Sequence, residues 1–337
     1  MPEPSGQSLL TVAHLSVEFR HRRRVVRAVH DVSMTLAAGE TLGLVGESGS
    51  GKTTIGRAIL GLTAPTRGTI SYRGQQLGSA ASRRSRRGLS DDLQVIFQDP
   101  YSSLNPARKI GASLVEAAAS RTPPDHARRR MLELLERVGL APSAADHYPS
   151  QFSGGQRQRI AVARALMPSP RIVICDEPLS ALDVSVQAQV LNLLMELQRE
   201  ASLAYVFISH DLDVVRLLAD RVMVLFRGQV LEHGPTGVVA ERPRSPYTQA
   251  LLAASRGLSG GVGVPPDTHT GQRTQADGCP FAPRCPLATE LCWQSMPALA
   301  PSPGGGEVAC HHSERAAAVA SATSPSDSDL RSLGIDP

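Results

Sequence analysis

The chain has 337 residues, 41% of them apolar, and a formal net charge of +4 at pH 7. This length and apolar content suit a globular chain of one large domain or two, and they exclude disorder throughout. No apolar stretch approaches the ~18 residues that cross a bilayer, and residues 1–6 lack the features of a secretory signal. We therefore expect a cytoplasmic protein. The short arginine runs, such as 128–130, are more typical of solvated faces than of nucleic-acid patches.

Residues 9–45 predict an antiparallel β layer. Four short stretches within residues 9–36 alternate apolar and polar residues, and Ala38-Gly39 forms a turn signal. Phe19 lies in this layer, where it can pack inside or stack on an adenine ring. The pattern alone favours packing.

A phosphate-binding loop is predicted directly after this layer. The apolar stretch Thr41–Val45 precedes Gly46–Thr53, which matches G-x-x-x-x-G-K-[ST], and the amphipathic segment Ile55–Leu60 follows. Glycines let backbone N–H groups turn around phosphates, and the following helix presents its positive end. Lys52 is then expected to reach the β and γ phosphates, while the Thr53 hydroxyl holds Mg²⁺.

A glutamine and a helical insert follow. Gln98 ends the apolar strand Leu93–Phe97, where its amide can face a metal or water or can simply close the strand. Residues 107–149 then look helical, because apolar residues from Met131 to Val138 recur on one helix face. We interpret this region as a helical insert in a core sheet.

A second glycine-rich stretch, Gln151–Arg159, opens the next predicted helix. Ser153 can cap this helix, whose first N–H groups then form a second anion site or merely a flexible entry. One nucleotide does not easily contact two helix N-termini from separate subdomains of one chain. A second copy of the protein, or a relative, could supply the other half of each site.

Two buried strands end in chemically useful side chains. Arg171–Glu177 is apolar up to two acids, and Ala204–His210 is apolar up to a histidine. Such strands belong to parallel sheets, whose carboxyl ends gather ligands. Asp176 can orient Mg²⁺, Glu177 can accept a proton from an attacking water, and His210 can sense the γ-phosphate.

Taken together, these motifs closely resemble the ATP-binding subunit of an ABC transporter over residues 9–250. The resemblance implies a Walker A loop at Gly46–Thr53, a Q-loop at Gln98, a signature at Phe152–Gln156 and a Walker B strand ending at Asp176. Phe152 departs conservatively from the family's usual leucine. The implied fold is α/β, with a P-loop NTPase core, an N-terminal antiparallel layer, a helical subdomain (about 107–168) and a small cysteine-containing extension.

The resemblance also assigns roles. Glu177, His210, Gln98 and Lys52 would be catalytic, and Thr53, Gln98 and Asp176 would hold Mg²⁺. Phe19 would stack on adenine, reversing the preference stated above. The full implied ATP-binding set is Phe19, Gly46, Glu47, Ser48, Gly49, Ser50, Gly51, Lys52, Thr53, Thr54, Gln98, Ser153, Gly154, Gly155, Gln156, Asp176 and Asp183.

The C-terminal region and two earlier segments indicate which subfamily of ABC transporters the chain resembles. Residues 98–106, 243–252 and 279–286 look like the dipeptide, oligopeptide and nickel importers, in which such cysteines can hold a [4Fe–4S] cluster. Four cysteines, Cys279, Cys285, Cys292 and Cys310, follow a Gly- and Pro-rich linker at 255–278. Their spacing lacks the C-x₂-C pairs of zinc modules, so we favour a cluster over zinc and over free thiols.

The expected organisation is an ATP-binding domain at 1–254, the linker, a four-cysteine extension at 279–315 and a disordered tail at 316–337. The resemblance implies a peripheral subunit on the cytoplasmic face of the membrane. Its partners would be a second ATP-binding subunit (a paralogue or an identical chain), two membrane permeases and, indirectly, a solute-binding protein, with no nucleic acid. The alternative is a soluble ABC ATPase that acts on nucleic acid or the ribosome.

Overall fold

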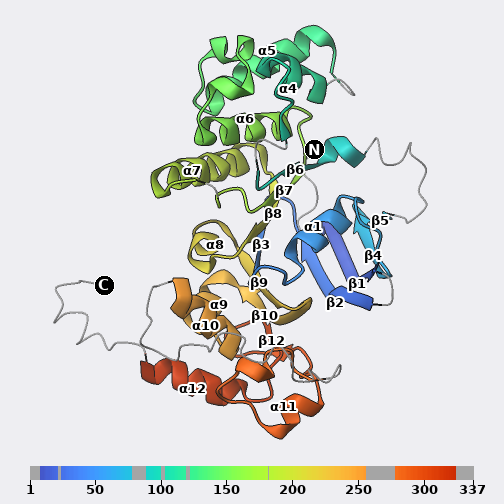
Figure 1. Ribbon diagram of the computed structural model, residues 1–337, viewed down its shortest axis with the longest axis vertical. Coiled ribbons are helices and arrows are strands. Elements are labelled where there is room, and N and C mark those ends of the chain that lie inside the picture. Colours follow the sequence, from blue (N-terminus) through green and yellow to red (C-terminus); the bar gives the residue numbers. More distant parts are fainter. Residues whose placement is uncertain are drawn as a thin grey trace, which may run out of the picture.

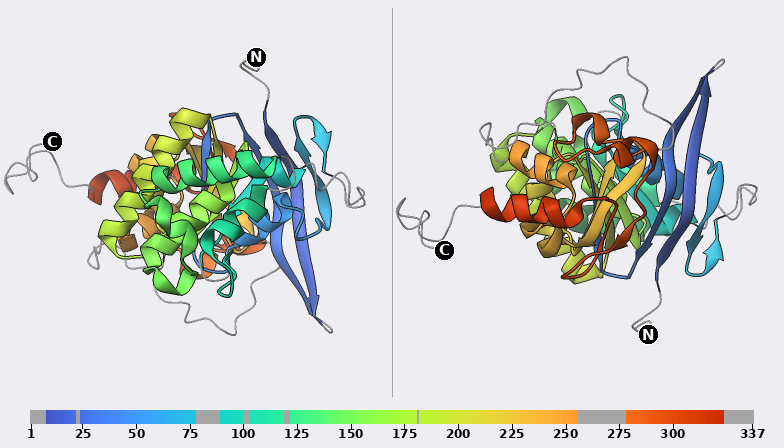
Figure 2. Two further views of the ribbon diagram at one scale, coloured as in Figure 1. Left: turned by 90° about the horizontal axis from the view of Figure 1, so that it is seen from above. Right: turned by 90° about the horizontal axis from the view of Figure 1, so that it is seen from below.

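The computed structural model describes residues 8–21, 24–77, 89–99, 103–118, 122–180, 182–255 and 278–323. Its strands form two sheets, and Figure 2 shows the smaller sheet as a separate layer beside the helical body. This arrangement confirms the predicted α/β fold with a parallel sheet and an N-terminal antiparallel layer. Among the described helices, none is both long and apolar enough to cross a membrane.

The smaller sheet is antiparallel, with the order β2, β1, β4, β5. Two long strands replace the four short ones that the sequence predicts, because His14 and Asp31 adopt positive φ within continuous strands and produce register shifts rather than turns. The strands are β1 (Leu10–His21), β2 (Arg24–Leu36), β4 (Arg67–Tyr72) and β5 (Gln75–Gln76).

The larger sheet has a parallel centre. Strands β9, β3, β8, β7 and β6 run parallel in that order, and β10, β12 and β11 continue the sheet with antiparallel pairing. β3 and β8 are buried along their whole length, which explains their uninterrupted apolar sequences. The bounds are β3 (Thr41–Val45), β6 (Leu93–Ile96), β7 (Ile172–Asp176), β8 (Ala204–Ser209), β9 (Arg221–Phe226), β10 (Gln229–Pro235), β11 (Ala300–Pro301) and β12 (Glu307–Val308).

Helices cover this sheet and extend beyond it. The helical insert stands at one end of the molecule, and the C-terminal segment lies at the other (Figure 1). The helices are α1 (Lys52–Ile59), α4 (Ile110–Ala118), α5 (Pro124–Arg137), α6 (Gly154–Leu166), α7 (Val184–Ala201), α8 (Leu212–Leu218), α9 (Thr236–Glu241), α10 (Pro246–Ser255), α11 (Glu290–Gln294) and α12 (Ser313–Thr323), with 3₁₀ turns at 142–146, 149–151 and 282–284.

The structure departs from the predicted tail at α12. This helix continues to Thr323, whereas the sequence predicts disorder from residue 316. Alanine has the highest helix propensity, and Ala316 is fully buried, with its carbonyl accepting from Gln249 Nε2 at 2.9 Å. Residues 324–337 and nearly all of the predicted linker lie outside the described residues.

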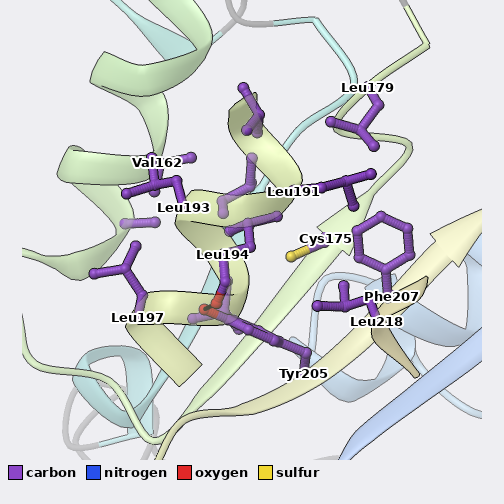
Figure 3. Packing of buried hydrophobic residues seen from close by; sticks show 14 of the residues in the cluster. Val162, Cys175, Leu179, Leu191, Leu193, Leu194, Leu197, Tyr205, Phe207 and Leu218 are labelled. Atoms are coloured by element: carbon purple, nitrogen blue, oxygen red, sulfur yellow. Dashed lines mark hydrogen bonds between the residues drawn. The ribbon is translucent and has the colours of Figure 1, made fainter. Parts of the chain in front are cut away.

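Two apolar cores hold the parallel sheet in place. One lies between the two sheets and includes Ile55 and Ile59 of α1. The other joins the opposite face of the parallel sheet to helices that include α6 and α7. Figure 3 shows Leu194 of α7 in this second core, together with Cys175 of β7. Cys175 is fully buried, and burial raises the pKa of its thiol, as expected for a small apolar residue.

The second core gives a stability prediction. Leu194 is 1% exposed, so Leu194→Ala should lower the free energy of unfolding by about 2–5 kcal/mol. Leu217→Ala is the control, because Leu217 is 61% exposed and should cost less than about 0.5 kcal/mol. Urea denaturation measures both. Equal losses for the two variants would contradict the packing described here.

Candidate functional site

The candidate site is a cavity at the C-terminal ends of the parallel strands. The carboxyl ends of β3, β6, β7 and β8 meet there, and the cavity has a volume of about 680 Å³. Its lining comprises Ala28, Glu47, Ser48, Gly49, Ser50, Gly51, Lys52, Thr53, Thr54, Gln98, Glu177, His210 and Leu251. Four separate motifs of the sequence therefore contribute to one cavity.

The loop between β3 and α1 follows the predicted phosphate-binding design. Gly51 has a φ of +101°, and a Cβ there would lie 2.3 Å from the backbone oxygen of Ala28. Only glycine is compatible with both conditions. Gly51 is also the N-cap of α1, so the positive end of that helix faces the cavity.

Lys52 lies at the centre of this loop. Its Nζ donates to the carbonyl oxygens of Gly46 (2.6 Å) and Glu47 (2.9 Å) and to Ser50 Oγ (3.3 Å). The residue is 4% exposed, and burial lowers the pKa of its ammonium group, while Glu177, Asp176 and Glu47 oppose that shift. The ammonium group is thus held inside the loop, where it can contact phosphate oxygens.

Two of the three predicted Mg²⁺ ligands, Thr53 and Asp176, are in contact. Thr53 Oγ1, at the start of α1, donates to Asp176 Oδ1, at the end of β7, at 2.8 Å. Burial raises the pKa of Asp176, and the Thr53 hydrogen bond opposes this shift. Hydroxyl and carboxylate oxygens are suitable Mg²⁺ ligands, so this pair fits the ion in chemistry and position.

Two predicted catalytic side chains, those of Gln98 and His210, lie beside one carboxylate oxygen of a third, Glu177. Gln98 Nε2 donates to Glu177 Oε2 at 3.3 Å, and His210 Nδ1 lies 3.5 Å from the same oxygen. Glu177 has a φ of +46°, an uncommon conformation for a non-glycine residue. Such backbone strain occurs preferentially at functional positions. Its side chain is 17% exposed and lines the cavity, where it can act on a water molecule.

The signature residues lie elsewhere. Ser153 Oγ accepts from the Gln156 N–H at 3.4 Å, and Gln156 Oε1 accepts from the Ser153 N–H at 3.0 Å, so a capping box starts α6. Asp183 Oδ1 accepts from the Val186 N–H at 3.0 Å and caps α7. The cavity lining described above includes none of Ser153–Gln156 or Asp183. Within this chain, the two predicted anion sites are therefore separate.

Phe19 is exposed, whereas the apolar–polar alternation alone favours packing of its ring inside the β layer. It pairs across the sheet with Val26, and the two side chains are 47% and 57% exposed. The interpretation of Phe19 as a core residue is therefore wrong. It presents an aromatic face to solvent, although it does not line the phosphate-loop cavity.

Sequence reasoning missed two residues that contact the phosphate loop. The Glu47 N–H donates to Tyr247 Oη at 2.8 Å, and both carboxylate oxygens of Glu47 pair with Arg284 at 2.8 Å. Tyr247 and Arg284 lie 200 and 237 residues beyond Glu47 in the chain. No local spacing signal connects such distant positions.

The four C-terminal cysteines converge on a second, much smaller cavity. Cys279, Cys285, Cys292 and Cys310 all line it, and its volume is about 20 Å³. Burial raises the pKa of the Cys285 thiol to about 11 and also raises that of Cys279 and Cys310. Among the described residues, however, no group of three or more His, Cys, Asp or Glu side chains is arranged to hold a metal ion. The donor chemistry fits a thiolate-bound centre, but the geometry does not support one.

Sequence comparisons match the chain to one transporter family in two regions. The ABC transporter family model matches residues 29–180, and the model described as oligopeptide/dipeptide transporter, C-terminal region, matches residues 231–292. The chain is 46% identical to the di/tripeptide transport ATP-binding protein DppF of Pseudomonas aeruginosa, over 86% of this chain and 91% of that protein. It is 42% identical to the oligopeptide transport ATP-binding protein AppF of Bacillus subtilis, over 87% and 92% of the two chains.

Two solved structures of ABC transporter proteins have folds similar to that of this chain. The ATP-binding cassette MJ0796, in a dimeric post-hydrolysis state with ADP and Pi, matches 67% of this chain and 98% of its own, with a TM-score of 0.61 and 27% identity. The cbiO1 protein from Clostridium perfringens, part of the ABC transporter complex cbiONQ, matches 70% and 92% of the two chains, with a TM-score of 0.63 and 28% identity.

Proposed function

Since the chain belongs to the dipeptide and oligopeptide family of ABC transporter ATP-binding subunits, we propose that it binds and hydrolyses ATP to drive import of peptides or related solutes. The observation that carries this proposal is the single cavity that the phosphate loop lines together with Gln98, Glu177 and His210. Asp176 joins this group through its hydrogen bond from Thr53. The relatives are peptide-transport subunits, and nothing favours the alternative of a nucleic-acid or ribosome ATPase.

The geometry suggests how each side chain contributes. The loop N–H groups and Lys52 would bind the phosphates, while Thr53, Asp176 and Gln98 would hold Mg²⁺. That ion would neutralise charge on the β and γ phosphates. Glu177 would orient and deprotonate the attacking water. His210, whose Nδ1 lies 3.5 Å from Glu177 Oε2, would contact the γ-phosphate.

The separate position of the signature supports a two-subunit site. Ser153–Gln156 open α6 outside the cavity, so they are free to meet the phosphates of a second subunit. In the resulting head-to-tail pair, each ATP would lie between one Walker A loop and the other subunit's signature. Asp183 would lie at the same interface, and Phe19 would stack on adenine.

We further propose the subunit's surroundings and organisation. The ATP-binding unit spans 1–254 with its helical subdomain at about 107–168, a linker spans 255–278, and the four-cysteine extension begins at 279. The partners are a second ATP-binding subunit, two membrane permeases and, indirectly, a solute-binding protein. The subunit is peripheral on the cytoplasmic face of the membrane.

Reconstitution tests the function. The purified chain, assembled with its permeases and second ATP-binding subunit in vesicles, should support Mg-ATP-dependent uptake of a dipeptide. The same assembly without ATP is the control. ATP hydrolysis stimulated by RNA and not by the permeases would instead support the nucleic-acid alternative.

A [4Fe–4S] cluster at the C-terminal cysteines remains part of this proposal. Its support is the donor set, since four thiols line one cavity and the matched C-terminal family model covers three of them. Bound there, a cluster would join the turns that carry Cys279, Cys285, Cys292 and Cys310 and would stabilise the extension.

Metal analysis of anaerobically purified protein tests this part. We expect about four irons and four sulfides per chain. Cys285→Ser should lose most of the iron, whereas Cys175→Ala should retain it because Cys175 is buried in the core. Stoichiometric zinc, or no metal, in the wild-type protein would contradict the cluster and leave the ATPase proposal standing.

A further inference from the structure

The C-terminal extension reaches the phosphate loop through one ion pair. Arg284 Nη1 and Nη2 donate to Glu47 Oε2 and Oε1, both at 2.8 Å. The side chains are 16% and 40% exposed, so the pair is partly shielded from water. Two parallel charge-assisted hydrogen bonds fix both position and orientation. Arg284 therefore constrains the side chain of the second residue of the loop.

An aromatic cluster holds Arg284 in this position. Its guanidinium carbon lies 5.7 Å from the ring centroids of both Phe226 and Phe281. Tyr247 packs against these rings at 4.6 Å and 5.3 Å, and its hydroxyl accepts the Glu47 N–H. Tyr247 of α10 thus contacts the backbone of Glu47 and Arg284 of the extension contacts its carboxylate, while Phe226 of β9 packs against both Tyr247 and Arg284. Figure 2, right, views the molecule from the side that the C-terminal segment covers.

The charge of Glu47 makes this contact significant for the nucleotide. Glu47 lines the same cavity as Lys52, and its carbonyl oxygen accepts from Lys52 Nζ at 2.9 Å. A carboxylate beside a site for a polyphosphate repels the ligand unless a cation neutralises it. Among the interactions of the described residues, the bidentate pair with Arg284 supplies that cation.

We propose that Arg284 is a positioning residue for the phosphate loop, acting through Glu47, and that the C-terminal extension is thereby part of the nucleotide site. The proposal rests on the proposed ATP-binding function. Arg284 ends the turn at 282–284 that separates Cys279 from Cys285. The four-cysteine extension must therefore be folded for Arg284 to neutralise Glu47. This requirement couples folding of the extension to nucleotide affinity.

Nucleotide binding by the purified full chain tests the proposal. We expect Arg284→Ala to raise the Kd for the Mg²⁺ complex of a non-hydrolysable ATP analogue about five- to tenfold at low salt, and less at high salt. Arg284→Lys should recover part of the affinity, because it restores the charge without the bidentate geometry. Arg315→Ala is the matched control, since Arg315 belongs to the same extension and is exposed.

The double variant separates this mechanism from a loss of stability. Glu47→Gln removes the repelling charge, so Arg284→Ala/Glu47→Gln should bind the analogue more tightly than Arg284→Ala alone. If Arg284→Ala does not fold, Arg284→Gln provides the same comparison. A Kd within about twofold of wild type for the folded single variant, or no recovery in the double variant, would overturn the proposal. A wild-type chain that does not bind the analogue would refute the ATPase function itself.

Discussion

Replacing Glu177 by Gln should lower the rate of ATP hydrolysis by about 10²- to 10⁴-fold while leaving ATP binding intact. The amide keeps the size and shape of the carboxylate and one acceptor oxygen, but it cannot accept a proton from water. Glu177 Oε2 lies within 3.3 Å of Gln98 Nε2 and 3.5 Å of His210 Nδ1, so its position is already fixed by neighbouring side chains. The substitution should therefore remove the base and little else.

Two measurements on the purified variant check this prediction. Phosphate release at saturating Mg-ATP gives the hydrolysis rate, and light scattering shows whether ATP traps a closed dimer that persists without turnover. Glu196→Gln is the control, because Glu196 is an exposed residue of α7 away from the cavity. Hydrolysis by Glu177→Gln at the wild-type rate would remove Glu177 from its proposed role.

The cavity could be predicted from the sequence because its chemistry follows from local patterns. A phosphate loop needs glycines and a lysine at fixed spacing, and parallel strands place their carboxyl ends at one edge. Gln98, Glu177 and His210 each follow or end such a strand, so their meeting in one cavity follows from the topology. The same reasoning also predicted that Ser153 would belong to a separate site.

Other features depend on long-range packing that no local pattern reports. The alternation in residues 9–36 is interrupted by polar residues such as His14 and Asp31, which suggest turns, yet pairing with neighbouring strands holds them in continuous β structure. The contact of Arg284 with Glu47 joins residues 237 positions apart, and the extension that carries Arg284 is itself paired to the large sheet through β12 and β10.

The C-terminal cysteines show a different limit of sequence reasoning. Their number and spacing predict a common site, and the structure does bring all four to one cavity. A donor set does not determine the separation of its thiols, because that separation depends on the backbone turns that carry them. The convergence of the four cysteines was therefore predictable here, while the geometry that a metal centre needs was not.

Lys52→Ala should raise the Kd for Mg-ATP by about 10²-fold, which corresponds to the loss of about 2–3 kcal/mol from hydrogen bonds between an ammonium group and phosphate oxygens. Lys109→Ala is a matched control, since Lys109 is the chain's other lysine and pairs with Asp146 at 3.4 Å on the surface. Equilibrium titration with a fluorescent ATP analogue measures both variants.

Lys52→Arg gives the sharper test of why this position carries a lysine in a chain whose other cations, apart from Lys109, are arginines. Lys52 is 4% exposed, and its Nζ lies 2.6 Å from the Gly46 carbonyl oxygen inside a tightly turned loop. A compact ammonium group fits that space, whereas the larger planar guanidinium group would displace the loop backbone that must contact the phosphates. We therefore expect Lys52→Arg to bind ATP no better than Lys52→Ala; affinity close to wild type would show that charge alone is sufficient at this position.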